Sequence, residues 1–121
     1  GMQLMCSYSE ENDTTCLGIF DETVKKFANK TPAGDTLKVP QIGWNQIVDT
    51  KTALFTNIEP NSYCYFVHGY YAAKGDHTIA TTEYGINYSA ALHKNNFYGT
   101  QFHPEKSATV GEKILVNFLS L

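Results

Sequence analysis

The most regular pattern in the chain lies near its end, where apolar side chains recur at spacings of three and four. The apolar positions are Val110, Ile114, Leu115, Phe118 and Leu119. This spacing places them on one face of an α-helix. Thr109 and Glu112 have the spacing of a capping box at the start of this run. The pattern predicts an amphipathic terminal helix that packs on a sheet.

Most of the preceding chain favours extended structure. Residues 63–68 combine aromatic and β-branched side chains and predict a strand that residues 69–71 prolong. Further strands are expected at 17–27, at 37–48 with breaks at Pro40 and Gly43, and at 78–84. Residues 89–93 and 97–102 predict a hairpin. Turns are expected at 9–13, 29–35 and 57–62.

Helices are few in this pattern. Met2, Leu4 and Met5 favour a second, short helix over residues 1–8. About six strands against two helices is an unbalanced count, because a parallel sheet needs helices on both faces. We therefore expect residues 1–121 to form one α/β domain that is incomplete by itself.

Charge and cysteine content exclude several classes of protein. The net charge of −3 gives no indication of nucleic-acid or anionic-membrane binding. No apolar run has membrane-spanning length, and the first residues lack the pattern of a signal peptide. Three cysteines without metal-ligand spacing indicate a reducing, cytoplasmic compartment. The histidines also lack metal spacing, so neither a metal nor another cofactor is expected.

Candidate chemistry centres on His103-Pro104-Glu105. In an extended chain, side chains at i and i+2 point the same way, so the Glu105 carboxylate can hold the His103 imidazole. Pro104 favours an extended conformation at His103. A histidine oriented by a carboxylate is the base half of a nucleophilic triad. Taken alone, a His-x-Glu sequence is more often an exposed polar pair.

The segment Phe102-His-Pro-Glu-Lys-Ser107, at a last strand followed by a terminal helix, resembles the class I glutamine amidotransferases. The resemblance implies a flavodoxin-like, three-layer α/β fold of which this chain is the C-terminal portion, mostly strands plus a terminal helix. It also implies a Cys-His-Glu triad in which His103 is the general base and acid and Glu105 orients it.

The nucleophile is not evident among the three cysteines. Cys16-Leu-Gly18 resembles part of a nucleophile elbow, but Thr14 and Thr15 are β-branched and do not suit its tight turn. Cys6 and Cys64 are expected to be small core residues. Gly1-Met-Gln-Leu matches the family elbow Gly-x-Cys-Leu-Gly-Met-Gln-Leu after its cysteine. On this alignment the nucleophile lies two positions before Gly1, and we expect an N-terminally truncated, inactive domain.

Four segments together resemble the glutaminase subunits of imidazole glycerol phosphate synthase. They are Val39-Pro-Gln-Ile-Gly-Trp-Asn45, Tyr65-Phe-Val-His-Gly-Tyr70, Thr81-Thr-Glu-Tyr-Gly85 and Phe102-His-Pro-Glu-Lys-Ser107. The resemblance implies hydrolysis of glutamine to glutamate and ammonia. It also implies that the partner is a (β/α)8-barrel cyclase subunit, which uses the ammonia to make imidazole glycerol phosphate and AICAR in histidine biosynthesis.

The same resemblance assigns the remaining candidate residues. Glutamine would be held by Gln3, Glu11, His68 and Tyr70. The family has Ser or Thr where Gly69 stands, which removes a hydroxyl contact. Partner contacts would come from Trp44, Tyr65 and Lys106. From the residues alone, the single tryptophan Trp44 fits an interface anchor and a rim-of-core residue equally well.

Two other functions stay open. One is the glutaminase of a different class I amidotransferase, such as anthranilate synthase or pyridoxal phosphate synthesis. The other is a non-catalytic module that keeps the synthase-docking face. Loss of strands from a sheet leaves an exposed edge and apolar surface, so a homodimer is also expected.

Overall fold

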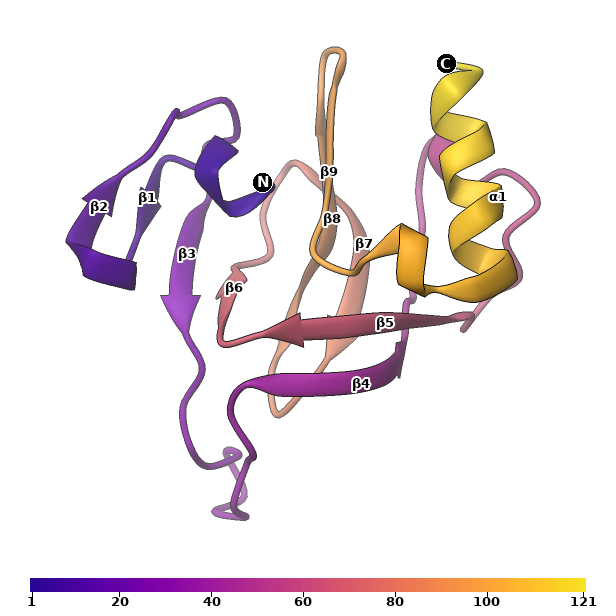
Figure 1. Ribbon diagram of the computed structural model, residues 1–121. Helices are drawn as coiled ribbons and strands as arrows, with labels where there is room; N and C mark the ends of the chain where they lie inside the picture. Colours follow the sequence, from indigo (N-terminus) through magenta and orange to yellow (C-terminus); the bar gives the residue numbers. More distant parts are fainter.

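Two sheets and one α-helix make up the computed structural model, which describes all residues from Gly1 to Leu121 (Figure 1). The larger sheet has the order β2-β1-β3-β6-β8-β7, with β9 paired to β8. Its strands are β1 (Tyr8–Ser9), β2 (Thr14–Thr15), β3 (Thr23–Lys26), β6 (Tyr70–Ala72), β7 (Thr78–Glu83), β8 (Asn87–Lys94) and β9 (Phe97–Thr100). The smaller sheet pairs β4 (Gln41–Gln46) with β5 (Tyr63–His68).

The helical elements are short apart from the last one. There are four 3-10 turns: η1 (Gln3–Met5) before the first strand, η2 (Glu11–Asp13) and η3 (Ala53–Phe55) between strands, and η4 (Pro104–Lys106) between β9 and the last helix. The only α-helix is α1 (Ala108–Leu119). The expected α/β class is confirmed, as a mixed sheet in which only β1 and β3 run parallel. None of the helices is long and apolar enough to span a membrane.

Strong local patterns predicted their elements well. The strand at 63–68 is β5, and the 78–84 strand and the hairpin are β7, β8 and β9 within a few residues. The expected prolongation past residue 69 is instead a separate strand, because β6 pairs with β3 and β8 in the larger sheet. Gly43 does not break β4, since its φ of +134° lies within a continuous pairing with β5.

Two N-terminal predictions are wrong. Residues 1–8 contain the 3-10 turn η1 and the first residue of β1 instead of an α-helix, and the 17–27 strand is limited to β3. The stretch before β3 is bound to the first residues through backbone hydrogen bonds from Leu17, Gly18 and Phe20 to Leu4, Cys6 and Met5. These bonds do not form a ladder, and Gly18 has a φ of +72°, so the segment cannot be a regular strand.

The predicted capping box is also wrong. Helix α1 begins at Ala108, with Ser107 as its N-cap, and Thr109 lies inside the first turn. The Ser107 hydroxyl accepts a hydrogen bond from the Tyr65 backbone N–H (3.0 Å) and donates one to the His103 carbonyl (2.6 Å). Ser107 is fully buried. Its side chain therefore links β5 to the start of α1 instead of capping the helix.

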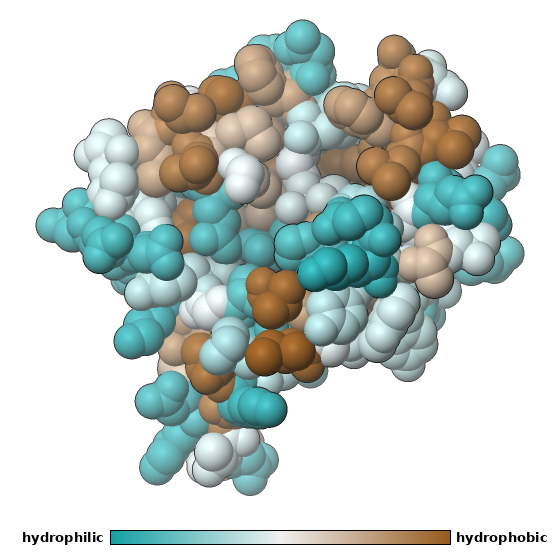
Figure 2. Space-filling view, viewed as in Figure 1, coloured by the Kyte–Doolittle hydropathy of each residue, from teal (hydrophilic) through white to brown (hydrophobic).

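Helix α1 buries only part of its apolar stripe. Ile114 packs in the main core with Phe66 and Phe102. A Cβ at Gly111 would lie 1.8 Å from the Pro104 carbonyl oxygen, so only glycine allows this close approach of α1 to η4. Figure 2 shows the rest of the stripe as apolar surface over the upper part of the helix. The exposed residues of the stripe are Leu115, Phe118 and Leu119, and Val116 beside them is also exposed.

A buried polar cluster joins the two sheets. His68 at the end of β5 contacts Gln41 of β4 (Nε2 to Oε1, 3.0 Å) and Tyr88 of β8 (Nε2 to hydroxyl, 2.9 Å). Its Nδ1 lies 2.6 Å from the Tyr70 carbonyl oxygen at the start of β6. Burial of the imidazole lowers the pKa of His68 to about 4. His68 is therefore neutral at pH 7 although both of its ring nitrogens meet polar groups.

Replacing Ser107 by alanine tests the link between β5 and α1. Ser107→Ala leaves the Tyr65 N–H without its partner in a buried place, which costs about 1–3 kcal/mol of unfolding free energy. Ser120→Ala is the matched control, because the Ser120 hydroxyl bonds only to the exposed Val116 carbonyl. Urea denaturation measures both variants. Equal midpoints for the two would show that the Ser107 hydroxyl bonds contribute nothing.

The neutral state of His68 predicts an acid-sensitive stability. Its native pKa of about 4 lies below the ordinary value of 6.5. The unfolded chain thus binds the proton first, and unfolding free energy falls as pH decreases from about 6.5 to 4, by roughly 3 kcal/mol in all. The stabilisation is fully present above this range. Denaturation between pH 4 and 7 measures it, with His93→Gln as control.

His68→Gln should flatten this part of the pH dependence, whereas His93→Gln should keep it. A curve for His68→Gln that is parallel to that of the unsubstituted chain would contradict the assignment.

Candidate active site

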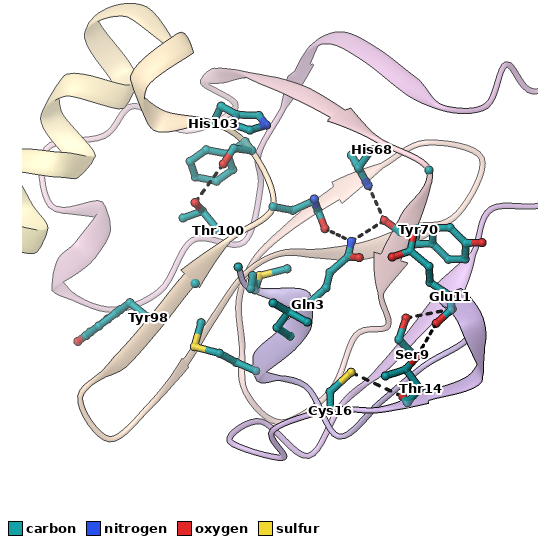
Figure 3. A pocket seen from close by; sticks show the side chains of 18 of the residues that line it. Gln3, Ser9, Glu11, Thr14, Cys16, His68, Tyr70, Tyr98, Thr100 and His103 are labelled. Atoms are coloured by element: carbon teal, nitrogen blue, oxygen red, sulfur yellow. Dashed lines mark hydrogen bonds between the residues drawn. The ribbon is translucent and has the colours of Figure 1, made fainter.

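A pocket of about 920 Å³ opens between the N-terminal segment, the junction of β5 with β6, and the segment after β9 (Figure 3). Six residues that the sequence singled out line it: Gln3, Glu11, His68, Tyr70, His103 and Glu105. They come from segments that are as much as about a hundred residues apart, and the sheet brings them together. Trp44, Tyr65 and Lys106 are not part of its lining.

His103 and Glu105 form the expected pair at the edge of this pocket. The His103 Nδ1 lies 2.8 Å from the Glu105 Oε1. His103 is extended, with φ −96° and ψ 101°, as Pro104 predicts. Glu105 instead lies in the 3-10 turn η4, so the contact is made across a turn and not along one strand face. The side chains are 40% and 59% exposed, so both reach the surface of the pocket.

The backbone of His103 is fixed on both sides. Its N–H donates to the Tyr65 carbonyl of β5 (3.0 Å), and its carbonyl accepts from the Ser107 hydroxyl. The side chain is therefore presented from a rigid support, as a base that must meet its proton donor requires.

Glu105 remains ionised beside His103. Its own backbone N–H is the largest cause that lowers the pKa of this carboxyl, followed by His103 and Lys106, while a little burial opposes them. A carboxylate at Nδ1 makes that nitrogen a donor and leaves Nε2 free to accept a proton. The pair can act as a general base and stabilise the resulting imidazolium.

Gln3 and His68 meet at one backbone carbonyl in the pocket wall. The Gln3 Nε2 donates to the Tyr70 carbonyl (2.8 Å), which also accepts from His68. The same amide nitrogen lies 2.5 Å from the Gln101 Oε1. Figure 3 shows this chain of contacts across the middle of the pocket. Here the wall is backbone at Gly69 and Tyr70, held by the side chains of Gln3 and His68, and Gln101 in turn holds the Gln3 amide.

Glu11 lies in η2, on the side of the pocket formed by the N-terminal segment (Figure 3). Its backbone N–H donates to the Ser9 hydroxyl (3.1 Å), and its carbonyl accepts from the Thr14 hydroxyl (3.0 Å). These bonds hold the turn, and the carboxylate itself makes no ion pair within the chain. It is therefore a free anionic group at the pocket.

The three cysteines do not complete the His103 site. Cys6 and Cys64 are fully buried, as expected, and burial raises the pKa of each thiol to about 12. Cys16 lines the same pocket, but its thiol lies 3.6 Å from the Thr14 carbonyl and makes no hydrogen bond to His103. Cys16 also follows the short strand β2, with no helix after it, so it does not occupy a nucleophile elbow.

The three predicted partner residues lie on a surface next to the pocket. Trp44 and Tyr65 face each other across β4 and β5, with ring centroids 5.9 Å apart at 74°. The same outward face carries Ile42, Tyr63 and Val67, all exposed. Trp44 is 52% exposed, which rules out the rim-of-core alternative. Figure 2 shows apolar surface over β4 and β5 in the lower middle of the view.

Lys106 directly follows the His103–Glu105 pair along the chain. It lies between His103 and Ser107, which both bond to the backbone of Tyr65, and it forms no ion pair.

Sequence reasoning missed three residues that support the site. Gln101, Gln41 and Tyr88 contact Gln3 and His68 over sequence separations of 20 to 98 residues. Gln101 precedes His103 by two positions. The alternation of side chains along a strand therefore indicated that Gln101 and His103 point to the same side. No local pattern indicated that Gln41 and Tyr88 meet His68.

Comparison with known proteins places the chain among amidotransferases. The family model "Glutamine amidotransferase class-I" matches residues 1–120. Imidazole glycerol phosphate synthase subunit HisH from Bacteroides fragilis is 53% identical over all of this chain and 60% of the relative. The protein of the same name from Shewanella sediminis is 47% identical and 56% covered. The chain thus spans about 60% of the length of the curated relatives it matches.

The fold comparison agrees. A Thermoplasma acidophilum protein described as belonging to a GMP synthase superposes with a TM-score of 0.62 at 19% identity, over 83% of this chain and 48% of that one. At this identity the likeness concerns the fold alone. Together with the family model, which matches nearly every residue, it leads to one conclusion: the chain belongs to the class I glutamine amidotransferase family.

Proposed function

We propose that this chain carries the base and the substrate pocket of a glutaminase that hydrolyses glutamine to glutamate and ammonia. The observation that carries this proposal is the His103–Glu105 pair, 2.8 Å apart, at a pocket that Gln3 and Glu11 also line. The Glu11 carboxylate is suited to the α-ammonium group of glutamine. The amide end of the substrate would then extend toward His103.

The reaction requires a thiol, and we propose that none of the chain's own cysteines supplies it. His103 would take the proton of the attacking thiol as the sulfur bonds to the amide carbon. It would return the proton to the nitrogen as the carbon–nitrogen bond breaks and ammonia leaves. Water activated by the same imidazole would then hydrolyse the thioester to glutamate. From the likeness of Gly1-Met-Gln-Leu to the family elbow, we propose that the thiol belongs to a cysteine two positions before Gly1. The 121-residue chain by itself is therefore proposed to be inactive.

The outward face of β4 and β5 is proposed to bind a (β/α)8-barrel cyclase subunit. Its ladder of exposed apolar and aromatic residues, with Trp44 and Tyr65 at the centre, has the composition of an interface core. The relatives that share about half of their residues with this chain are named as synthase subunits. Ammonia would pass to the partner, which makes imidazole glycerol phosphate and AICAR in the cytoplasm.

A non-catalytic binding module is the second candidate function. The exposed β4–β5 face does not depend on a catalytic thiol, because it is formed by β4 and β5 alone. For the 121-residue chain by itself, this favours binding of a partner over catalysis. The exposed apolar residues of α1 also support self-association of the isolated chain as a homodimer.

Binding of L-glutamine tests the pocket without needing turnover. Titration into the isotopically labelled chain should shift NMR resonances of Gln3, Glu11, Tyr70 and His103. Glu11→Gln removes the charge opposite the α-ammonium group and should weaken binding about tenfold. Glu112→Gln, an exposed carboxylate on α1, is the matched control. Shifts confined to residues outside the pocket would contradict the proposal.

Turnover tests the assignment of the nucleophile. The 121-residue chain mixed with the cognate cyclase subunit should release no ammonia from glutamine. A chain extended at its N-terminus with the family's elbow and preceding strands should release it, and His103→Ala should lower that rate about 10²–10⁴-fold. Ammonia release by the 121-residue chain would show that one of its own thiols is the nucleophile.

Trp44→Ala tests the docking face. Truncation of a central aromatic anchor should weaken binding to the cyclase partner by about 30-fold, as measured by calorimetry. Phe97→Ala is the control, because Phe97 is an exposed aromatic at the tip of the β8–β9 hairpin. Equal affinities of the two variants would place the partner elsewhere.

A further inference from the structure

The side-chain amide of Gln3 lies between two acceptors in the pocket wall. Its Nε2 is 2.8 Å from the Tyr70 carbonyl oxygen at the start of β6 and 2.5 Å from the Gln101 Oε1, just after β9. Figure 3 shows the Gln3 side chain reaching the middle of the pocket from the N-terminal segment. All three residues line the pocket, and no step of the proposed reaction uses Gln101.

The Tyr70 carbonyl determines the orientation of the Gln3 amide. A backbone carbonyl oxygen can only accept, so the Gln3 atom 2.8 Å from it must be the nitrogen. With the amide reversed, two acceptor oxygens would face each other. The second hydrogen on the same nitrogen meets Gln101, so the Gln101 atom at 2.5 Å must be its carbonyl oxygen. The orientation of both amides therefore follows from one backbone group.

The hydrogens on the Gln3 amide are all used within the chain. A primary amide nitrogen carries two hydrogens, and Tyr70 and Gln101 accept one each. The Gln3 Oε1 makes no hydrogen bond within the chain. Gln3 can therefore offer a ligand an acceptor and no donor. Without Gln101, one N–H of Gln3 would be free in the pocket, and only one hydrogen bond would hold the amide.

The main chain fixes Gln101 and brings Gln3 close to it. The Gln101 backbone N–H donates to the Ala90 carbonyl of β8 (2.8 Å), which ties Gln101 to the larger sheet. A Cβ at Gly99 would lie 2.7 Å from the Met2 Cγ, so glycine allows the N-terminal segment to lie this close to β9. Gln101 is thus a fixed acceptor within reach of Gln3.

We propose that Gln101 is a positioning residue that fixes the Gln3 amide as a hydrogen-bond acceptor for an N–H group of glutamine. The ligand has two such groups, the α-ammonium group and the side-chain amide. L-glutamate lacks the amide hydrogens, and glutaramate, which is glutamine without its α-amino group, lacks the α-ammonium group. The identity of the ligand rests on the proposed function, whereas the orientation of the Gln3 amide does not.

Hydrogen exchange of the Gln3 side-chain amide tests the orientation in the full 121-residue chain without a ligand. In the unsubstituted chain, both hydrogens on the Nε2 should exchange slowly with solvent, as measured by NMR of the ¹⁵N-labelled protein. Gln101→Met keeps a long side chain but removes the acceptor, and it should speed the exchange of one of the two hydrogens about fivefold. Gln101→Glu keeps an acceptor oxygen and should retain the slow exchange of both.

Gln46→Met is the matched control, because Gln46 is an exposed glutamine of β4 that is not part of the pocket lining. Neither hydrogen on the Gln3 Nε2 should change its exchange rate in this variant. Fast exchange of both hydrogens in the unsubstituted chain, or unchanged exchange in Gln101→Met, would overturn the proposal. Faster exchange of backbone amides throughout Gln101→Met would show a general loss of stability and would also overturn it.

The affinities of three ligands give the functional consequence. Gln101→Met should raise the dissociation constant for L-glutamine about fivefold, the effect of roughly one hydrogen bond. Of L-glutamate and glutaramate, the one that keeps the N–H group at Gln3 should lose as much affinity, and the other should bind both chains equally. An equal loss for all three ligands, or no loss for any, would overturn the proposal. Slow exchange that depends on Gln101, in a chain that binds no L-glutamine, would support the positioning role and refute the proposed substrate.

Discussion

The site depends on how the backbone of His103 is held. Its N–H bonds to the Tyr65 carbonyl, and its carbonyl accepts from the buried Ser107 hydroxyl, which also accepts from the Tyr65 N–H. Tyr65 of β5 thus holds the His103 N–H directly and the His103 carbonyl through the Ser107 hydroxyl. Tyr65 therefore positions the His103 imidazole and is also part of the outward aromatic face of β4 and β5. A displacement of β5 on partner binding would necessarily move the base, which gives the proposed interface a physical route to the chemistry.

The pocket itself is built by a second buried arrangement. The contacts of His68 with Gln41, Tyr88 and the Tyr70 carbonyl join the small sheet to the large one. Burying four polar groups together is costly unless their hydrogen bonds match, so these groups fix one another's positions. The same contacts therefore stabilise the fold and shape the wall of the pocket. The low pKa of His68 keeps this arrangement neutral at physiological pH.

The sequence predicted those parts that local chemistry determines. Residues 63–68 and the hairpin form as expected because their β-propensity and turn residues agree with the tertiary structure. The His103–Glu105 contact follows from short spacing and from Pro104. The family and fold class follow from the segments around Trp44 and His103, and both are confirmed. The roles of the individual site residues remain predictions.

Other features depend on long-range contacts that no local pattern reveals. The capping box at Thr109 failed because the Tyr65 N–H, 42 positions away from Ser107, recruits that side chain instead. The 17–27 strand failed because backbone groups of the first residues bind that segment in an irregular loop. Gln41 and Tyr88 were missed for the same reason, since only the meeting of β4, β5 and β8 makes them partners of His68.

The proposed function requires that this chain hold glutamine with its amide toward His103, and the structure of the chain with L-glutamine bound tests this most directly. We predict glutamine in the 920 Å³ pocket, with its α-ammonium group at the Glu11 carboxylate and its amide carbon on the His103 side. An empty pocket at saturating L-glutamine, or a ligand with its amide pointing away from His103, would contradict the proposal.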